Sequence, residues 1–339
     1  MEKLNESMAW LAKQDGSLIV GHGPFVESSE PPADGTSFYV QDFALQDAKP
    51  WKTPSTVERT TIREMTMRFQ NAASISCGWL PLDAAPFSVV FQEVMSSIHS
   101  GIFEKTVPVV TETGMADQPA GFAIMAAMTR QPLPLHSYGW IDGDSGFSGA
   151  TPELLFALDG TCLETMALAG TARSDDREVF AVDEKEIREH EYVAQTLVSK
   201  LLDLGNIDRS AREILDLGSI VHFLTHIRLD LQSPRTPDEL IRKLHPTPAL
   251  GPLPRTAETL SLLFEWRNRL GCPKQFGAPF GLLDEGKFDA IVAIRGIWWE
   301  KNQVLLPAGC GVIEASRLVN EWRELRLKRE AVKRFMLPL

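Results

Sequence analysis

The sequence predicts an α+β fold. Strand-like and helix-like segments follow one another without the regular alternation that a doubly wound parallel sheet requires. Between residues 133 and 173, short segments of period-2 hydrophobicity are separated by the turns Asp142-Gly-Asp-Ser-Gly146 and Asp159-Gly160, a pattern typical of antiparallel hairpins. No glycine-rich phosphate-binding motif follows a predicted strand, so neither a dinucleotide nor a nucleoside triphosphate is implied.

The first half of the chain outside these hairpins supplies two helices and, besides a strand at 102–110, two short strands. Residues 17–21 and 37–40 are rich in β-branched and aromatic residues, which predicts strands. Apolar residues recur with helical spacing over 87–98, which predicts an amphipathic helix. A second helix is expected at 118–130.

The second half of the chain is richer in helices. Apolar residues recur there with helical spacing in several segments, and Gly205 marks the end of the first of them. Helices are predicted at 184–204, 212–216, 238–244, 256–270 and 316–335, and strands at 290–295 and 303–306.

Composition narrows the class of partner. With 339 residues the chain is long enough to bury a sizeable core. Its net charge of −11 argues against nucleic acid or an anionic membrane, yet allows a small anionic substrate, because a few local cations or a bound metal reverse the local field. The N-terminus lacks the pattern of a signal peptide, and the cysteines show no paired spacing, so we expect a cytoplasmic protein with reduced thiols at Cys77, Cys162, Cys272 and Cys310.

Two pairs of glutamates stand out on predicted helices. Glu186 and Glu189 lie near the start of the helix at 184–204, and Glu321 and Glu324 lie on the last helix. A spacing of three residues places both carboxylates of a pair on one helix face. Two such helices side by side offer oxygen ligands that suit Mg²⁺. Glutamates at this spacing are also common on solvated helices, so spacing alone leaves both interpretations open.

Lys105 and Glu153 are candidates for acid–base chemistry. The β-branched run 102–110 predicts a strand in which Lys105 points the same way as Phe103 and Val107. Burial lowers the pKa of a lysine and raises that of a carboxyl group, so Lys105 suits a general base and Glu153 a general acid. The alternatives are a lysine that reaches solvent from a strand end and a carboxylate in a turn.

Three further features suit an anionic ligand. Arg295 ends an apolar strand, where an arginine needs a substrate carboxylate or a structural salt bridge. The small-residue stretches 167–171 and 308–311 allow either close approach of the backbone to a ligand or tight sheet packing. A separate question is whether His222 and His226, four residues apart, bind zinc. No third ligand at zinc-like spacing is evident, which favours a structural role for His226.

Taken together, nine segments between about residues 87 and 336 resemble the chorismate-utilising enzyme family. This family contains anthranilate, aminodeoxychorismate, isochorismate and salicylate synthases. The nine segments occur in the family's order along the chain. They are Lys105-Thr-Val107, GATPELL at 149–155, ALAGTAR at 167–173, EKEIREHEYV at 184–193, IVHFLT at 220–225, LHPTPALG at 244–251, AIRG at 293–296, AGCGVI at 308–313 and EWRELRLK at 321–328.

The resemblance implies one α+β domain of two packed antiparallel sheets, with helices outside and the active site between the sheets. Residues 1–85 are then a divergent N-terminal part of the sheet core, and residues 86–339 the chorismate-binding catalytic region. Magnesium ligands and substrate-binding residues follow from the same resemblance. Mg²⁺ is expected at Glu189 and Glu324 with Glu186 and Glu321 close behind, and the substrate at Gly170, Thr171, His222, Arg295, Gly309 and Lys328.

Particular positions favour conversion of chorismate to isochorismate. Members that add ammonia usually lack the base lysine, so Lys105 implies water as the nucleophile, with Glu153 as the acid. Ala169 stands where aminodeoxychorismate synthases commonly have lysine, and the segment PTPALG is similar to isochorismate synthases. Two departures from the family pattern are the missing arginine after the Lys105 strand and a shorter N-terminal portion.

Other activities of the same fold stay open. They are a salicylate synthase, an anthranilate synthase component I, and a chorismate-binding protein without catalysis. The expected partner is the small molecule chorismate. No glutamine amidotransferase subunit, nucleic acid or membrane is expected, and the chain is expected to act as a monomer or a weak homodimer.

Overall fold

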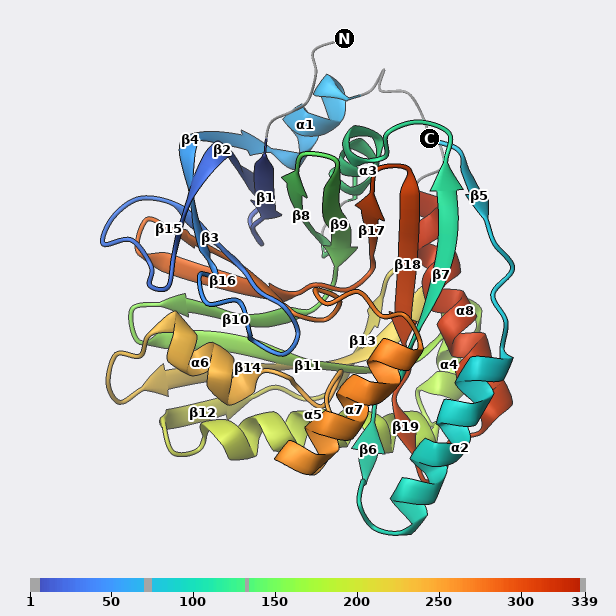
Figure 1. Cartoon of the computed structure of the whole chain (residues 1–339). Coiled ribbons are helices and arrows are strands. Elements are labelled where there is room, and N and C mark those ends of the chain that lie inside the picture. Colours follow the sequence, from blue (N-terminus) through green and yellow to red (C-terminus); the bar gives the residue numbers. More distant parts are fainter. Residues whose placement is uncertain (1–6, 70–74, 132–133, 336–339) are drawn as a thin grey trace.

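One antiparallel strand network forms the centre of the protein. The computed structural model describes residues 7–69, 75–131 and 134–335. Within these ranges 17 strands are joined by hydrogen bonds, and they lie in two layers that cross at a steep angle (Figure 1). No helix in this part of the chain is both long and apolar enough to cross a membrane.

The first layer stands upright in Figure 1. Its hairpin at 136–151 arises where the sequence predicts it, because the turn that begins at Asp142-Gly143 reverses the chain between segments that alternate in hydrophobicity. In order of pairing its strands are β5 (Cys77–Trp79), β7 (Val109–Ala116), β18 (Gln303–Gly309), β17 (Gly296–Glu300), β9 (Ser145–Thr151), β8 (His136–Asp142) and β1 (Met8–Ala12).

The second layer runs across the first. In order of pairing its strands are β3 (Ser37–Val40), β15 (Pro279–Asp284), β16 (Lys287–Val292), β10 (Leu154–Asp159), β11 (Cys162–Arg173) and β14 (Ile220–Leu231), with β12 (Gly205–Arg209) and β13 (Glu213–Asp216) both paired to β14. The inner faces of the two layers share one core: Phe147 of β9 packs edge-on against Phe280 of β15, with ring centroids 5.8 Å apart.

Two long strands connect the layers. β2 (Ser17–Ser28) pairs with β1 and with β4 (Trp51–Thr61), and β4 also pairs with β3. The pairing of β2 with β4 shifts register between His22 and Phe25, as a strand does where it bends. The predicted α+β fold with packed antiparallel layers is confirmed, and in addition hydrogen bonds continue from one layer into the other. The division of the chain at residue 85 stays a prediction.

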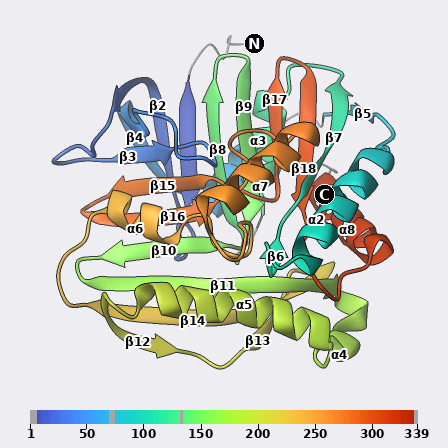
Figure 2. The same cartoon turned by 60° about the horizontal axis from the view of Figure 1, so that its bottom comes forward.

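The helices cover the outside of the layers. α5 (Glu184–Leu201) is amphipathic, as the sequence predicts, and lies along β11 and β14 (Figure 2). Its predicted end at Gly205 is wrong: the helix ends at Leu201, because Gly205 begins β12 and pairs with Leu231 of β14. The helices are α1 (Ile62–Arg68), α2 (Ala85–His99), α3 (Gly121–Met128), α4 (Arg177–Phe180), α5 (Glu184–Leu201), α6 (Pro237–Leu244), α7 (Ala257–Arg269) and α8 (Leu318–Phe335), with a 3₁₀ turn at Ser174–Asp176. A separate ladder joins β6 (Lys105–Thr106) to β19 (Val312–Ile313).

Three predicted elements are wrong. Residues 212–216 form strand β13 rather than a helix, because Ile214 packs against Phe223 across the β13–β14 pair and five residues are too few to nucleate a helix alone. The predicted strand 102–110 is two strands, β6 and β7, separated at Pro108, which has no N–H to donate. The strand predicted at 290–295 ends at Val292 instead.

Candidate active site

Two helices bring four carboxylates together. Glu186 and Glu189 lie in the first two turns of α5, whose N-cap Asp183 accepts a hydrogen bond from the Glu186 backbone N–H. Glu321 and Glu324 lie at the start of α8. Glu189, Glu321 and Glu324 are all buried, with 5, 1 and 8% of their surface exposed. A solvated helix face, the alternative for these pairs, is therefore wrong here.

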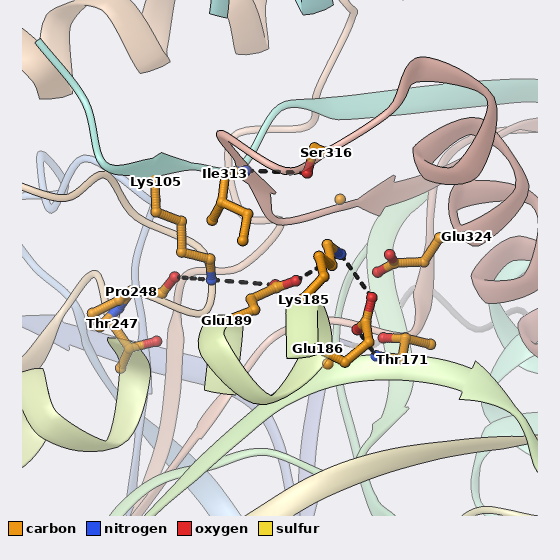
Figure 3. A network of polar contacts seen from close by, with 12 residues as sticks. Lys105, Thr171, Lys185, Glu186, Glu189, Thr247, Pro248, Ile313, Ser316 and Glu324 are labelled. Atoms are coloured by element: carbon orange, nitrogen blue, oxygen red, sulfur yellow. Dashed lines mark hydrogen bonds and ion pairs between the residues drawn. The ribbon is translucent and has the colours of Figure 1, made fainter. Parts of the chain in front are cut away.

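An ammonium group stands among these carboxylates. Lys185 Nζ lies 2.8 Å from Glu186 Oε1, 3.0 Å from Glu189 Oε2 and 3.6 Å from Glu321 Oε1. Figure 3 shows Lys185 pointing into the space between α5 and α8, with Glu324 opposite. The lysine directly before Glu186 thus neutralises part of the negative charge that the two helices bring together.

The cluster does not ionise uniformly. Burial raises the pKa of Glu186 to about 7 and that of Glu321 to about 8, and neighbouring carboxylates add to both shifts. Burial acts in the same direction on Glu189, but Lys185, Lys105 and Lys328 outweigh it and lower the pKa of Glu189 to about 2. Glu189 is therefore ionised at neutral pH.

The cluster fits a hard divalent cation in its chemistry. Carboxylate oxygens are the ligands that Mg²⁺ prefers, and the buried Glu321 Oε2 has no hydrogen-bond partner. In the ranges that the structure describes, no three acidic, histidine or cysteine side chains lie close enough together to hold one ion. The ammonium of Lys185 occupies the space between them, so the carboxylates surround a cation already.

Lys105 is completely buried. Its backbone is held between Ile313 of β19 and Leu253, and its Nζ donates to the Pro248 carbonyl at 2.6 Å and lies 3.4 Å from Glu189 Oε1. Desolvation lowers the pKa of Lys105, and the attraction of Glu189 opposes this only in part. The alternative of a lysine that reaches solvent is wrong, and the shift favours a general base.

Glu153 lies on the wall of a cavity and is 4% exposed. Burial raises its pKa to about 7, although Lys105 and a hydrogen bond from Thr247 Oγ1, 3.4 Å from Oε1, lower it. Thr247 is adjacent to Pro248, whose carbonyl holds Lys105. Two consecutive residues of one loop therefore hold the proposed acid and the proposed base.

The anion-binding candidates meet on the same cavity. Arg295 Nη2 lies 2.8 Å from His222 Nε2, and His222 Nδ1 lies 2.7 Å from the Gly170 carbonyl. A carbonyl only accepts and a guanidinium only donates, so His222 is neutral with its proton on Nδ1. Burial, followed by Arg295, lowers the pKa of His222 well below its usual value. Thr171 contributes its backbone N–H to Glu186 Oε2 at 2.8 Å.

Arg295 has guanidinium N–H donors that no carboxylate of the described residues accepts from. Its backbone has a φ of +56°, in the break between β16 and β17, and burial lowers its pKa to about 10. Among the residues described, no carboxylate lies within 4 Å of its guanidinium. The structural salt bridge weighed from the sequence is therefore absent there, and the cavity-lining guanidinium remains suited to a substrate carboxylate.

Lys328 and Gly309 complete the set of predicted residues. Lys328 Nζ lies 2.5 Å from Glu324 Oε1 and donates to the Gly309 carbonyl at 2.8 Å. Both residues line the cavity, as do Glu189, Gly170 and Thr171. Glu186, Glu321 and Glu324 lie behind this lining. Lys105 also lies behind it, enclosed by Glu189 and the Pro248 carbonyl.

Sequence reasoning missed three contributors. The role of Lys185 could have been predicted locally, because it is adjacent to Glu186 and four residues before Glu189, a spacing that brings a lysine and a glutamate together on a helix. Thr247 and Pro248 lie in the family-like segment 244–251, but nothing local indicated their contacts with Glu153 and Lys105, which arise only through the fold. At Gly311, left open between ligand binding and crowding, Glu189 and Lys105 fill the space that a Cβ would occupy.

Replacing Gly311 by alanine is expected to disrupt the site. An added Cβ would overlap Glu189 Oε1 and lie 2.9 Å from Lys105 Cε, so both buried side chains must shift. We expect kcat/KM to fall at least ~10-fold and the free energy of unfolding to fall by about 1–3 kcal/mol. Steady-state kinetics and urea unfolding check both.

Gly78→Ala is the matched control. A Cβ at Gly78 meets only the Met115 carbonyl, at 3.9 Å, and its φ is not positive. This variant is expected to keep native activity. Native activity and stability in Gly311→Ala would show that Glu189 and Lys105 are not held where the structure places them.

Comparison with known proteins defines the class. A family model described as chorismate binding enzyme matches residues 55–337, so the chain belongs to the chorismate binding enzyme family. The resemblance seen in the nine sequence segments, and with it the prediction of an enzyme of this family, is confirmed.

Individual relatives lie within the isochorismate synthases, which are isomerases. The chain is similar to isochorismate synthase EntC of Escherichia coli strain K12, at 25% identity over 333 residues, covering 92% of this chain and 79% of the relative. It is 29% identical over 253 residues to the salicylate biosynthesis isochorismate synthase of Pseudomonas aeruginosa, covering 71% and 52%. The solved structure of MenF, the menaquinone-specific isochorismate synthase of Escherichia coli, matches in fold with a TM-score of 0.81 at 19% identity, covering 99% of this chain and 90% of that one.

Proposed function

We propose that the protein converts chorismate to isochorismate. The observation that carries this proposal is the placement of two groups of opposite function: Glu153 on the wall of the cavity, and Lys105 directly behind Glu189 of the same wall. The wall also presents Arg295, whose guanidinium has no carboxylate partner among the described residues. Family membership and similarity to proteins named isochorismate synthase support it.

The reaction needs one proton removed and one delivered. Lys105 takes a proton from a water molecule whose oxygen bonds to C2 of the ring. The two ring double bonds shift, the C4–O bond breaks, and Glu153 protonates the departing hydroxyl, which leaves as water. One water enters and one leaves, so the net change is an isomerisation. The lowered pKa of Lys105 and the raised pKa of Glu153 are the shifts these roles require.

Substrate orientation falls to the remaining cavity residues. Arg295, fixed by neutral His222, offers a planar pair of donors to a carboxylate. Lys328 lines the cavity beside it, and Gly170, Thr171 and Gly309 bring backbone close to the ligand. Bound Mg²⁺ would neutralise the ring carboxylate, and the residues that would hold it are Glu189 and Glu324 with Glu186 and Glu321 behind them.

Product analysis tests the proposal. The purified protein is incubated with chorismate, with MgCl₂ or with EDTA, and the products are separated by chromatography. Isochorismate formed only with Mg²⁺ is the expected result. Fluorescent salicylate would instead assign a salicylate synthase, ammonia-dependent anthranilate an anthranilate synthase, and chorismate bound without turnover a non-catalytic protein. We further propose that the chain acts in the cytoplasm, as a monomer or weak homodimer without a glutamine amidotransferase subunit.

A further inference from the structure

Three lysines contact the carboxylate cluster, and they are held differently. Lys105 and Lys328 each donate to a backbone carbonyl as well, that of Pro248 and that of Gly309. The hydrogen bonds of the Lys185 ammonium in the described part of the chain go to carboxylates alone, those of Glu186 and Glu189. Lys105 and Lys328 are therefore anchored to the backbone, whereas Lys185 is held by the cluster itself.

The Lys185 side chain is also partly exposed to solvent. Its side chain is 19% exposed, whereas that of Lys105 is fully enclosed. It lies on the first turn of α5, and a lysine side chain has four rotatable bonds with which to swing toward solvent. Its ammonium can leave the cluster without any movement of the helix.

We propose that Lys185 is the internal cation of the metal-free site and that it leaves the cluster when Mg²⁺ enters. Lys185 has this role only if the four glutamates hold Mg²⁺ as proposed above. The lysine then sets the affinity for the ion and prevents four buried carboxylates from facing one another while the ion is absent.

Charge balance supports the exchange. The Lys185 ammonium contacts the carboxylates of Glu186, Glu189 and Glu321. A divalent ion brings one positive charge more than the ammonium it replaces, so these carboxylates keep a cation throughout the exchange. An ion that entered while Lys185 stayed would lie beside a like charge, and the carboxylates that Lys185 holds apart would not converge on it.

Occupancy by Lys185 weakens the apparent affinity for the ion. A site that is competent only when a side chain has left binds with its intrinsic dissociation constant divided by the competent fraction. Replacing Lys185 by methionine keeps most of the volume and removes the cation. We therefore expect Mg²⁺ to bind at least ~10-fold more tightly to Lys185→Met than to the native protein. In EDTA the same variant is expected to unfold about 5 °C or more below the native protein, because the buried carboxylates lose a partner.

Isothermal titration with MgCl₂ and thermal unfolding in EDTA test the proposal without any turnover. Arg188→Met is the matched control, since it removes one positive charge from an exposed position of the same helix. It is expected to match the native protein in both measurements. Lys185→Arg keeps a cation in the cluster and is expected to restore most of the metal-free stability.

The outcomes separate the two proposals. Tighter Mg²⁺ binding together with lower metal-free stability in Lys185→Met, and neither change in Arg188→Met, supports the exchange. Equal Mg²⁺ affinity of Lys185→Met and the native protein overturns it while leaving the metal site in place. If neither protein binds Mg²⁺, the exchange is overturned together with the metal site, and formation of isochorismate from chorismate, measured separately, still decides the function.

Discussion

Replacing Lys105 by alanine is expected to lower kcat for isochorismate formation at least ~100-fold, because the proposed base that takes the proton from water is then missing. Lys105 is enclosed by Glu189 and the Pro248 carbonyl and has no contact with Arg295, so KM for chorismate is expected to change little. Steady-state kinetics at saturating Mg²⁺ measure both constants. A loss in kcat without a loss in KM is the pattern of an interaction made only in the transition state.

Lys287→Ala controls for the loss of a lysine. Lys287 lies on β16 with 57% of its side chain exposed and pairs with Asp159 at the surface. Its removal is expected to leave kcat within a factor of two. Thermal unfolding of Lys105→Ala separates lost chemistry from lost structure. A folded Lys105→Ala protein that converts chorismate at the native rate would remove Lys105 from the mechanism.

Replacing Glu153 by glutamine is expected to lower kcat by a similar factor, ~100-fold or more, because the amide keeps the size and loses the acidic proton. The pH dependence adds a second signature. Burial raises the pKa of Glu153 to about 7. The protonated form is the active acid, so kcat/KM is expected to fall as pH rises through about 7, and this descending limb is expected to be absent from Glu153→Gln.

Thr247→Val tests the assignment of this pH dependence to Glu153 without changing either proposed reacting group. The Thr247 hydroxyl donates to Glu153 Oε1 and lowers the pKa of that carboxyl. Without it the pKa rises further, so the descending limb is expected to move to higher pH while kcat at its plateau is largely kept. A limb that stays in place in both Thr247→Val and Glu153→Gln would mean that another group titrates.

Local patterns predicted the parts of this structure that local physics determines. The helical period over 87–98 and the Asp-Gly turns of the hairpins depend on residues within one or two turns of each other, and both are confirmed. The glutamate pairs were visible for the same reason, since three residues separate the members of each pair.

What the sequence could not predict depends on distant partners. Residues 212–216 carry a helical pattern that pairing with β14 overrides. The burial of Glu321 and Glu324 depends on the start of α8 reaching the start of α5, more than a hundred residues away in sequence, where Lys185 contacts Glu321. Continuity of the two layers depends on β2 and β4 pairing with both, which no local pattern encodes.

In the candidate site, too, local patterns predicted single residues but not their contacts with distant parts of the chain. From the residues alone Lys105 and Glu153 were two separate hypotheses with surface alternatives, and the family resemblance put them in one reaction. Only the fold shows that Thr247 and Pro248 hold both groups, because their hydrogen-bond partners lie 94 and 143 residues away in the chain. The positive φ of Arg295 likewise arises from a strand break that its apolar neighbours do not predict.

Conversion of chorismate in H₂¹⁸O tests the central claim most directly, because the proposed reaction adds a hydroxyl from water at C2 and releases the original C4 hydroxyl. Isochorismate is purified by chromatography after incubation with Mg²⁺, and its mass and the position of the label are measured by mass spectrometry. We predict isochorismate that carries one ¹⁸O atom, located on C2. Isochorismate without the label, or no isochorismate at all, would contradict the account.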